Sequence, residues 1–276
     1  MLRYAVEISP DTAVITGASS GLGASYARVL AAGGYRCTLI ARRSDRLQAL
    51  AQELEHAGAP QPRPYRADLA DPQELAQVAQ MIAADRPKLL VINAGFGLAD
   101  PFFRCDPRDL TQMIRVHVDH VVQLLRAFLA SIPEGTVRAS DGRAVIVVAS
   151  IAAFSPAPAP ALYTSTKRFQ VELVRALAIG HREIAFQVLC PGFVRTEFHS
   201  RMGHSRADRP RLLPWNDAIS VVRYSLRKLR SGKVVVVPGL AYRMLLILRR
   251  AIPEALYRLV VRRTGWRERG DQNGRG

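Results

Sequence analysis

Short apolar segments alternate with longer segments of helical periodicity along most of this chain. The apolar segments are continuous and rich in β-branched residues, which predicts strands, and the segments between them predict helices. Continuous apolar strands are typical of a parallel sheet covered by helices on both faces, because neither face then meets water. We therefore expect an α/β fold with a doubly wound parallel sheet of about seven strands, at residues 12–16, 36–41, 63–67, 88–93, 143–150, 185–190 and 233–238.

Capping signals place the helices between these strands. Asp71-Pro72 and Asp106-Pro107 each combine an N-capping side chain with proline at the first helical position. The polar segment 193–213 carries few structural signals and is expected to be a lid or substrate loop, with a disordered insertion as the alternative. The expected helices cover 24–32, 44–57, 72–85, 107–131, 161–179 and 214–230.

A glycine-rich turn, Gly17-Ala-Ser-Ser-Gly21-Leu-Gly23, directly follows the first expected strand and precedes the first helix. Gly17 allows a tight turn, Gly21 lets the backbone approach a pyrophosphate, and Gly23 lets the helix pack closely. The helix N-terminus also presents free N–H groups to phosphate. This strand, turn and helix predict a Rossmann-like dinucleotide site.

The residues after the second strand bear on which dinucleotide binds. An NAD-binding unit usually has an acidic residue near this point, to hold the ribose hydroxyls. Here Ala41 is followed by Arg42 and Arg43, and a guanidinium group suits a 2′-phosphate. The sequence therefore favours NADP (NADPH) over NAD, although the two arginines could instead be solvated residues that open the next helix.

Candidate acid–base chemistry is concentrated around residues 150–167. Tyr163 and Lys167 are four residues apart, so on a helix they share one face. An ammonium group beside a phenol lowers the phenol pKa, which predicts an acid/base group useful near neutral pH. Ser150 ends an apolar strand and can donate to a carbonyl oxygen held near Tyr163. Taken alone, the pair also fits an ordinary exposed helix pair.

The carboxyl ends of parallel strands meet at one edge of a sheet, where ligands of such sheets bind. Residues that follow six different strands are therefore expected to line one crevice: Gly17, Arg42, Asp68, Asn93, Ser150 and Pro191.

In their order and spacing, these motifs resemble the single-domain branch of the short-chain dehydrogenase/reductase family, over residues 11–238. TGASSGLG at 16–23 resembles the family's cofactor turn, Asp68-Leu69 its adenine contact and Asn93-Ala94-Gly95 its fourth-strand turn. Pro191-Gly192 with Thr196 resembles its nicotinamide-side loop. The cofactor-binding residues that the resemblance implies are Gly17, Ser19, Ser20, Gly21, Leu22, Gly23, Arg42, Arg43, Asp68, Leu69, Asn93, Ala94, Gly95, Tyr163, Lys167, Pro191, Gly192, Val194 and Thr196.

The resemblance implies an NADP(H)-dependent oxidoreductase that interconverts a secondary alcohol and a ketone. Tyr163 is then the general acid/base, Ser150 orients and polarises the substrate oxygen, and Lys167 holds the cofactor ribose and depresses the pKa of Tyr163. The cofactor carries the hydride, and no metal site is expected. The polar loop and the apolar tail favour a fairly hydrophobic substrate.

The sequence departs from the family at one catalytic position. His117, in Arg115-Val-His-Val-Asp119, occupies the place of an asparagine that belongs to a proton relay towards the lysine. An imidazole both donates and accepts, and it titrates near neutral pH. We therefore expect His117 to support a relay with altered pH dependence, with a packed histidine at a helix kink as the alternative.

The net charge of +16 is concentrated in the last third of the chain. Residues 195–276 contain 19 Arg and Lys against 6 Asp and Glu, whereas the rest is nearly balanced. Such a surface attracts acidic substrates, anionic lipid or nucleic acid, and the alternative is a solvated basic face. The nucleotide half shows no basic–aromatic interleaving, so a nucleic-acid-binding protein ranks last among the possible functions. A non-catalytic NADP(H)-binding regulator ranks second.

The expected domains are a single catalytic domain, 1–240, and a basic amphipathic extension, 241–276. Leucine-rich positions alternate with arginines in 241–263, and Pro253 divides this stretch into two expected helices. Such helices can lie on an anionic membrane, cap a substrate pocket or pair two subunits. Residues 270–276 are expected to be disordered.

Three separated cysteines and the lack of a signal-like apolar run in residues 1–10 lead us to expect a cytoplasmic protein, with contact to the inner face of a membrane through 241–263 left open. Family resemblance implies a homo-oligomer, a dimer or tetramer, paired through helices 107–131 and 161–180.

Overall fold

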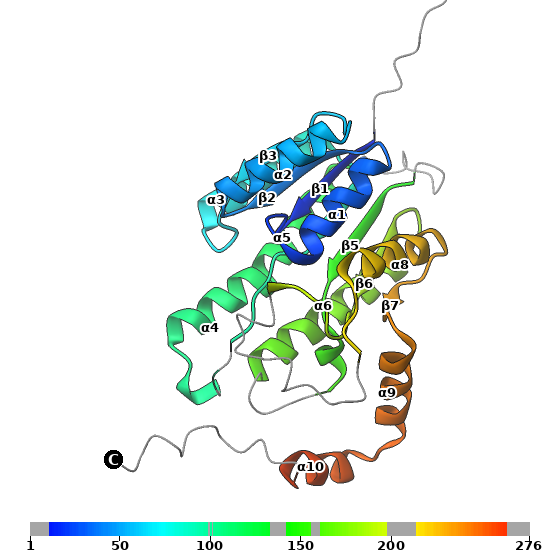
Figure 1. Ribbon diagram of the computed structural model, residues 1–276. Coiled ribbons are helices and arrows are strands. Elements are labelled where there is room, and N and C mark those ends of the chain that lie inside the picture. The colour runs from blue at the N-terminus through cyan, green and yellow to red at the C-terminus, as the bar shows by residue number, and fades with distance from the viewer. Residues whose placement is uncertain are drawn as a thin grey trace, which may run out of the picture.

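A seven-stranded, all-parallel sheet in the order β3-β2-β1-β4-β5-β6-β7 forms the centre of the molecule (Figure 1). The computed structural model describes residues 11–98, 100, 102–132, 142–155, 161–197 and 214–263. The sheet confirms the expected doubly wound α/β fold. Its strands are β1 Thr12–Thr16, β2 Arg36–Ala41, β3 Arg63–Arg66, β4 Leu89–Ile92, β5 Ala144–Val148, β6 Ala185–Leu189 and β7 Val235–Val236.

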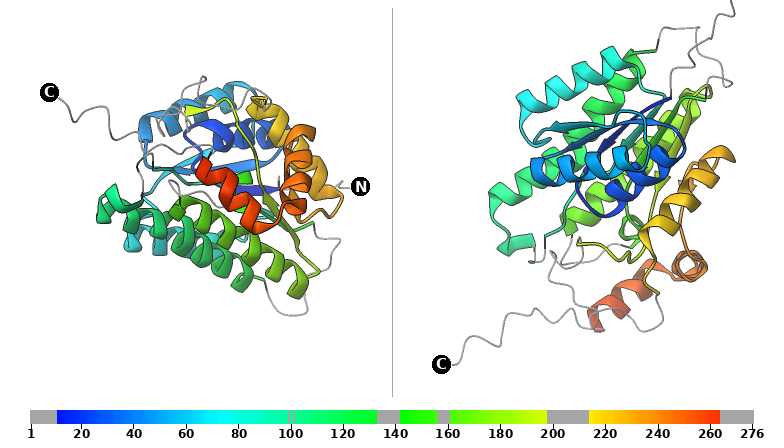
Figure 2. Two further views of the ribbon diagram at one scale, coloured as in Figure 1. Left: turned by 90° about the horizontal axis from the view of Figure 1, so that it is seen from below. Right: turned by 45° about the horizontal axis from the view of Figure 1, so that its top comes forward.

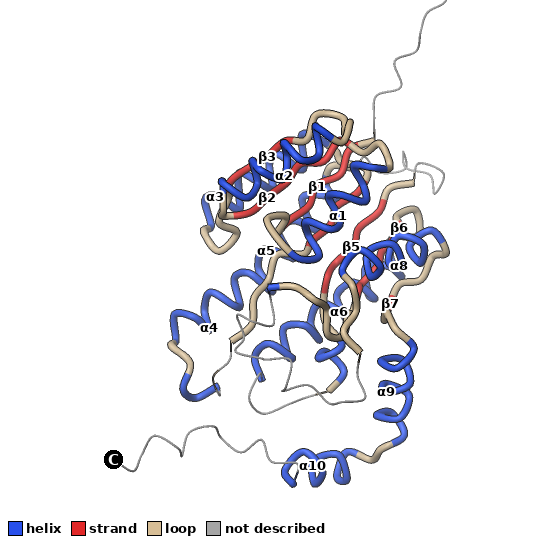
Figure 3. The backbone as a smooth tube through the Cα atoms, viewed as in Figure 1, coloured by secondary structure: helices blue, strands red, loops and turns tan. Residues whose placement is uncertain are grey.

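Helices cover both faces of this sheet (Figures 1 and 3). The first face is covered by α1 Gly21–Ala32, α2 Ser44–His56 and α8 Ala218–Arg230. The second is covered by α3 Pro72–Asp85, α5 His120–Ala130 and α6 Ala161–Gly180. Helix α4 Pro107–Ile114 precedes α5 and contacts α6. Alternation along the strands separates the two cores: Ile15 packs on the first face and Val14 on the second. Both faces are apolar, which explains the continuous apolar strands.

The helix expected over 107–131 is interrupted by a π-helical turn, Arg115–Asp119, between α4 and α5. A π turn inserts one extra residue into the helix and kinks its path. Apolar periodicity does not reveal it, because the residues on both sides keep the helical pattern.

Two other differences from the expected elements have local causes. The helix expected from 214 begins at Ala218, because Asp217 caps it by accepting the Ser220 N–H at 2.9 Å. The preceding Asn216 instead forms a bridge with Val194. The short 3₁₀ turns η1 Phe102–Arg104 and η4 Ile151–Phe154 were not expected, since three or four residues carry no periodic signal.

The C-terminal extension forms the two helices expected from its sequence, α9 Leu240–Ala251 and α10 Glu254–Arg263, separated at Pro253. They lie beyond the carboxyl ends of the strands, and α10 is nearest the viewer in the left panel of Figure 2. Among the described residues, none of the helices is both long and apolar enough to cross a membrane.

The order of the strands reverses between β1 and β4, where the chain crosses from one half of the sheet to the other. The turns that follow these two strands therefore diverge to opposite sides and leave a crevice between them. Gly17 follows β1 and Asn93 follows β4. The fold thus brings the predicted glycine turn and the predicted asparagine turn to the same point.

Candidate active site

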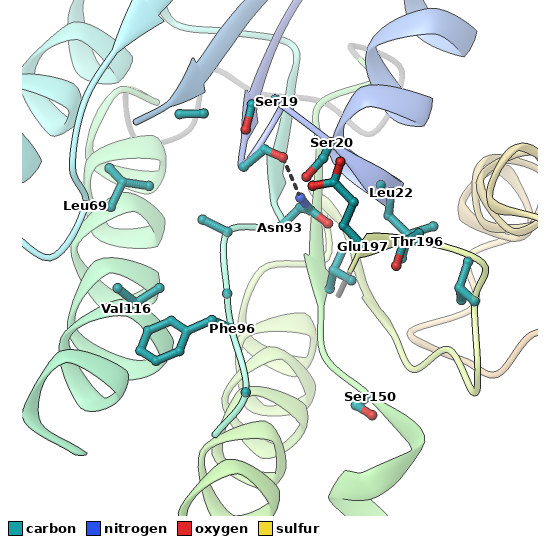
Figure 4. A pocket seen from close by; sticks show the side chains of 18 of the residues that line it. Ser19, Ser20, Leu22, Leu69, Asn93, Phe96, Val116, Ser150, Thr196 and Glu197 are labelled. Carbon is teal, nitrogen blue, oxygen red and sulfur yellow. Dashed lines mark hydrogen bonds between the residues drawn. The ribbon is translucent and has the colours of Figure 1, made fainter. Parts of the chain in front are cut away.

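A pocket of about 270 Å³ opens at the carboxyl ends of the strands (Figure 4). Ser19 and Ser20 lie at one end of it, Asn93 near the middle and Ser150 at the other end. Gly23 and His117 lie behind the wall rather than in it. The predicted site residues that line the pocket are Gly17, Ser19, Ser20, Gly21, Leu22, Arg42, Arg43, Asp68, Leu69, Asn93, Ala94, Gly95, Ser150, Tyr163, Lys167, Pro191, Gly192, Val194 and Thr196.

The glycine turn has the backbone geometry that its sequence predicts. Gly17 and Gly21 have φ of +66° and +56°, in the left-handed region that favours glycine. A Cβ on Gly23 would lie 2.2 Å from the carbonyl oxygen of Gly17, so only glycine fits there. The turn therefore depends on glycine at all three positions.

Asn93 supports this turn from β4. Its Nδ2 donates to the carbonyl oxygens of Thr16 at 3.0 Å and Gly17 at 3.3 Å. In return, Thr16 Oγ1 accepts the backbone N–H groups of Asn93 and Ala94, both at 3.0 Å. The Asn93 side chain thus fastens the carboxyl end of β4 to the turn after β1.

The N-terminus of α1 is suited to phosphate. The Ser20 side chain does not cap the helix, whereas Asp71 caps α3 by accepting two backbone N–H groups. The hydroxyl of Ser20 instead accepts a hydrogen bond from Arg43 at 2.8 Å. The first N–H groups of α1, the positive end of its dipole and the glycine turn together fit the pyrophosphate of a dinucleotide.

Arg43 is more closely integrated into the pocket than Arg42. Arg43 donates to Ser19 Oγ at 3.0 and 3.2 Å, and its side chain is 27% exposed. The Arg42 side chain is 57% exposed and lies 3.9 Å from the Asp68 carboxylate. Both line the pocket.

Arg43 and Arg46 already hold an anionic group. The Glu197 carboxylate lies 3.2 Å from Arg43 and 2.5 Å from Arg46. The hydrogen bonds from Arg46 and Arg43 lower the pKa of Glu197. Of the two guanidinium groups, Arg43 lines this end of the pocket, where it can bind an anion.

The predicted catalytic side chains converge at the opposite end. Tyr163 and Lys167 extend from α6, and Ser150 follows β5. The side chains of Tyr163 and Ser150 are hydrogen-bonded to each other. Ser150 Oγ also accepts the Ala152 N–H at 3.1 Å, which fixes the orientation of the serine. The arrangement can protonate and polarise an oxygen atom placed between the two hydroxyl groups.

The expected lowering of the Tyr163 pKa by Lys167 is wrong in this structure. Burial raises the pKa of Tyr163 to about 12, and the hydrogen bond with Ser150 only partly opposes this. Burial also lowers the pKa of Lys167 to about 7, so the ammonium form is only partly populated at neutral pH. In both groups, the cost of desolvating the charged form is the largest cause of the shift.

A glutamine links Lys167 to the π turn. Lys167 Nζ donates to the Val148 carbonyl at 3.0 Å and to Gln170 Oε1 at 3.2 Å. The other end of that amide, Gln170 Nε2, donates to the His117 carbonyl at 2.8 Å. Gln170 is buried, and it therefore fixes the distance between the lysine and the kinked helix.

Both ring nitrogens of His117 have partners. Nε2 accepts the Phe96 N–H at 3.1 Å, so Nδ1 carries the proton that it donates to Thr166 Oγ1 at 2.9 Å. Burial, with a smaller contribution from Lys167, lowers the pKa of His117 well below its ordinary value. The expectation that this ring changes charge near neutral pH is therefore not met, and its relay role stays a prediction.

Sequence reasoning missed several residues of the site. Gln170 could have been found as a polar residue one turn after Lys167, on the helix face that carries the site. Ala41, Ala67 and the small residues beside Ser150 carry no chemical signal, and their position depends on the fold. The lining residues that were not predicted are Ala41, Ala67, Phe96, Gly97, Val116, Val148, Ala149 and Glu197.

A parallel, doubly wound sheet with a glycine turn at its switch point defines a dinucleotide-binding class of proteins. The profile described as short chain dehydrogenase matches residues 11–207 of this chain. The chain therefore belongs to the short-chain dehydrogenase family, which confirms the resemblance found in its sequence.

Curated relatives cover most of the same region. Sulfoacetaldehyde reductase 2 of Chromohalobacter salexigens is 31% identical over 195 residues, which are 68% of this chain and 74% of the relative. Very-long-chain 3-oxoacyl-CoA reductase-A of Danio rerio is 29% identical over 204 residues, 72% of this chain. That match spans 62% of the length of the Danio rerio protein.

Solved structures show the same architecture. A short-chain dehydrogenase from Sphingobium yanoikuyae in complex with NADPH superposes with a TM-score of 0.75 at 27% identity, covering 89% of this chain and 97% of its own. An alcohol dehydrogenase from Thermococcus sibiricus complexed with 5-hydroxy-NADP gives 0.69 at 27% identity, covering 82% and 95%.

Proposed function

We propose that this protein is an NADP(H)-dependent oxidoreductase that interconverts a secondary alcohol and a ketone. The observation that carries the proposal is the convergence of Ser150, Tyr163 and Lys167 in the same pocket as the glycine turn. A dinucleotide held by that turn would lie in the same pocket as the three side chains. The glycine cradle, the uncapped start of α1 and the anion-binding arginines all fit such a cofactor.

The three side chains have separate roles in the proposed reaction. When bound, the nicotinamide supplies or accepts the hydride. Tyr163 gives its phenolic proton to the ketone oxygen, or takes the proton of the alcohol in the reverse direction. Ser150 donates a hydrogen bond to the same oxygen and orients it. Lys167 is buried beside Tyr163 and would bind the ribose of the cofactor.

The preference for NADP(H) rests on Arg43 and Arg42. Arg43 lies between the glycine turn and Glu197, where its guanidinium group would meet a 2′-phosphate. Arg42 lines the same end of the pocket from a more exposed position. The two structural neighbours described above, which were solved with NADPH and with 5-hydroxy-NADP, support this preference.

Titration of NADPH and NADH tests the cofactor proposal. We expect the unmodified protein to bind NADPH at least about tenfold more tightly, which corresponds to one charge-assisted contact. Arg43→Ala should remove most of this preference and Arg42→Ala a smaller part. Arg28→Ala is the matched control, because Arg28 forms a surface ion pair with Glu53 away from the pocket. Equal affinity for both dinucleotides would contradict the preference for NADP(H) but not the proposed oxidoreductase activity.

A carbonyl reductase screen tests the reaction itself. Phe96, Val116 and Val148 make part of the pocket wall apolar, which supports a fairly hydrophobic ketone substrate. NADPH oxidation by such ketones should fall about 10²- to 10⁴-fold in Tyr163→Phe, the range lost with a general acid. If NADPH binds but no ketone or alcohol is turned over, the second candidate applies: a non-catalytic NADP(H)-binding regulator.

The basic tail supports a further proposal, contact with an anionic membrane. Ile247 and Leu248 are exposed on α9, and arginines occupy neighbouring positions. Co-sedimentation with liposomes of phosphatidylglycerol should be reduced by Ile247→Ser with Leu248→Ser. Equal sedimentation of the two proteins, or none by either, would rule the membrane proposal out.

A further inference from the structure

Tyr242 is the one described residue of α9 that is fully buried, at 0% exposure. Its neighbours in the described part of the helix are exposed or half-buried. The position of α9 on the domain is therefore set largely by one aromatic side chain, which comes from the C-terminal extension.

The Tyr242 hydroxyl joins two points that are distant in the sequence. It accepts the Phe193 N–H at 3.0 Å and donates to the Pro214 carbonyl at 2.6 Å. Beside it, Asn216 N–H donates to the Phe193 carbonyl at 2.8 Å, and Arg195 N–H donates to the Asn216 carbonyl at 3.0 Å. The two ends of the long connection after β6 are thus fastened together at Tyr242.

The Tyr242 ring presses against the back of the pocket wall. A Cβ on Gly192 would lie 2.2 Å from ring atoms of Tyr242, so the ring fills the space that glycine leaves. Gly192 is not among the described glycines with positive φ. Glycine is therefore needed here for the close approach of the Tyr242 ring, not for the backbone conformation. Its backbone lies between the ring on one side and the pocket on the other.

The segment that Tyr242 holds, 191–196, connects both ends of the site. The Pro191 carbonyl accepts the Ile151 N–H at 3.0 Å, directly after the catalytic serine. At the other end, Thr196 lies 3.2 Å from where a Cβ of Gly21 would be. A displacement of this segment would therefore alter the packing beside Ser150 and beside the glycine turn.

We propose that Tyr242 is a positioning residue of the active site. It holds segment 191–196 in the place that binding of the nicotinamide half of the cofactor and of the ketone requires. Helix α9 is then a component of the catalytic domain and not only an appended interaction surface. The inference rests on the proposed function, and it assigns the extension a part in that function.

Tyr242→Phe tests the proposal, because it removes both hydrogen bonds and keeps the ring. We expect the Kd of NADPH and the KM of the ketone to rise about fivefold, the effect of a lost buried hydrogen bond. The Kd of 2′,5′-ADP should stay within about twofold, because this half-ligand lacks the nicotinamide. Its binding groups, Gly17, Arg43 and Asn93, make no described contact with Tyr242.

Tyr26→Phe is the matched control. Tyr26 is also fully buried, and its hydroxyl donates to Ser225 Oγ at 2.6 Å between α1 and α8, outside the pocket lining. The Tm of Tyr26→Phe should fall by about as much as that of Tyr242→Phe, whereas its affinity for NADPH should be unchanged. The proposal is wrong if Tyr242→Phe behaves like this control, with lower Tm but NADPH Kd and ketone KM within twofold of the unmodified protein.

Hydrogen exchange provides a second test in the unmodified chain, should Tyr242→Phe fail to fold. NADPH should slow amide exchange in α9 as well as in 191–196, and protection confined to 191–196 would overturn the proposal. An unmodified protein that binds neither dinucleotide would refute the proposed function instead. If neither dinucleotide binds and Tyr242→Phe folds, the positioning role can still be tested by itself. An unchanged rate of exchange of the Phe193 amide in Tyr242→Phe would then refute it.

Discussion

Lys167 illustrates how burial and neutral hydrogen-bond partners set the chemistry of a side chain. It is 4% exposed and has two described acceptors, the Val148 carbonyl and Gln170 Oε1. Both acceptors are neutral, so they do not compensate for the loss of water, and the pKa of Lys167 falls to about 7. Gln170 is therefore the residue through which the charge of the lysine can be changed.

Gln170→Glu should raise the pKa of Lys167. A carboxylate 3.2 Å from Nζ favours the ammonium form, and an opposite charge at such a distance shifts a pKa by about 1 to 3 units. The lysine-dependent limb of the pH profile of kcat/KM should move to higher pH by at least about one unit. Gln123→Glu, on the exposed side of α5, is the control. An unmoved limb would show that Lys167 does not control the profile.

The pKa of Tyr163 predicts how the rates of ketone reduction and alcohol oxidation depend on pH. Its pKa of about 12 keeps the phenol protonated through neutral pH, so proton donation to a ketone is available there. Alcohol oxidation needs the phenolate, whose fraction below the pKa rises about tenfold per pH unit. Oxidation rates should therefore rise between pH 7 and 10, whereas reduction should not depend on Tyr163 in this range. Initial rates in both directions measure this, and a flat oxidation profile would contradict it.

At the scale of elements, the π turn between α4 and α5 organises the site from behind. It directs the His117 carbonyl towards Gln170 and the His117 ring towards the Phe96 N–H. These contacts join three elements that the sequence separates: the turn after β4, the kinked helix and α6. The packed position of the histidine at this kink explains why its pKa is lowered.

The outer faces of α4 and α6 support the expected pairing of subunits. Ile114 on α4 is 46% exposed and Ile179 on α6 is 76% exposed. Ile114→Asp with Ile179→Asp should shift the protein towards monomer, because association would bury these charges. Light scattering after gel filtration measures the mass. Ile247→Asp, on the exposed face of α9, is the control, and dissociation by this control alone would place the subunit contact on the extension instead.

At the scale of the whole molecule, nucleotide binding couples the two halves of the sheet. The pocket wall takes residues from the turns after β1 and β2 on one side and from β5, α6 and the turn after β6 on the other. A ligand that contacts both halves stabilises the native state by mass action, since the unfolded chain does not assemble the pocket.

NADPH should therefore raise the Tm. At a hundredfold excess over Kd, binding adds about 2.7 kcal/mol to the free energy of unfolding, which is about 5 to 10 °C for a domain of this size. NADH at the same concentration should produce a smaller shift, and Arg43→Ala should make the two shifts alike. Differential scanning calorimetry measures them, and a Tm that responds to neither dinucleotide would contradict the assembled pocket.

Local patterns determined the fold class and most of the site. Apolar runs and capping residues predicted the seven strands and most helix ends, because these signals act within a few residues. The starts expected at 24 and 214 were each off by three or four residues. Glycines 17, 21 and 23 predicted the turn, and the spacing of Tyr163 and Lys167 placed both on one helix face. Most of the expected lid segment, residues 198–213, and the disorder expected at 270–276 lie outside the described residues.

The tertiary structure decided what depends on the approach of distant segments. The pKa directions of Tyr163 and Lys167 follow from burial, which spacing on a helix does not reveal. Arg43 contacts Ser19 and Ser20 of the glycine turn across a large separation in sequence, and Gln170 meets the π turn only when α6 packs on it. Tyr242 reaches the pocket wall from far along the chain. Sequence patterns report on neighbours along the chain, whereas desolvation and long-range hydrogen bonds arise from neighbours in space.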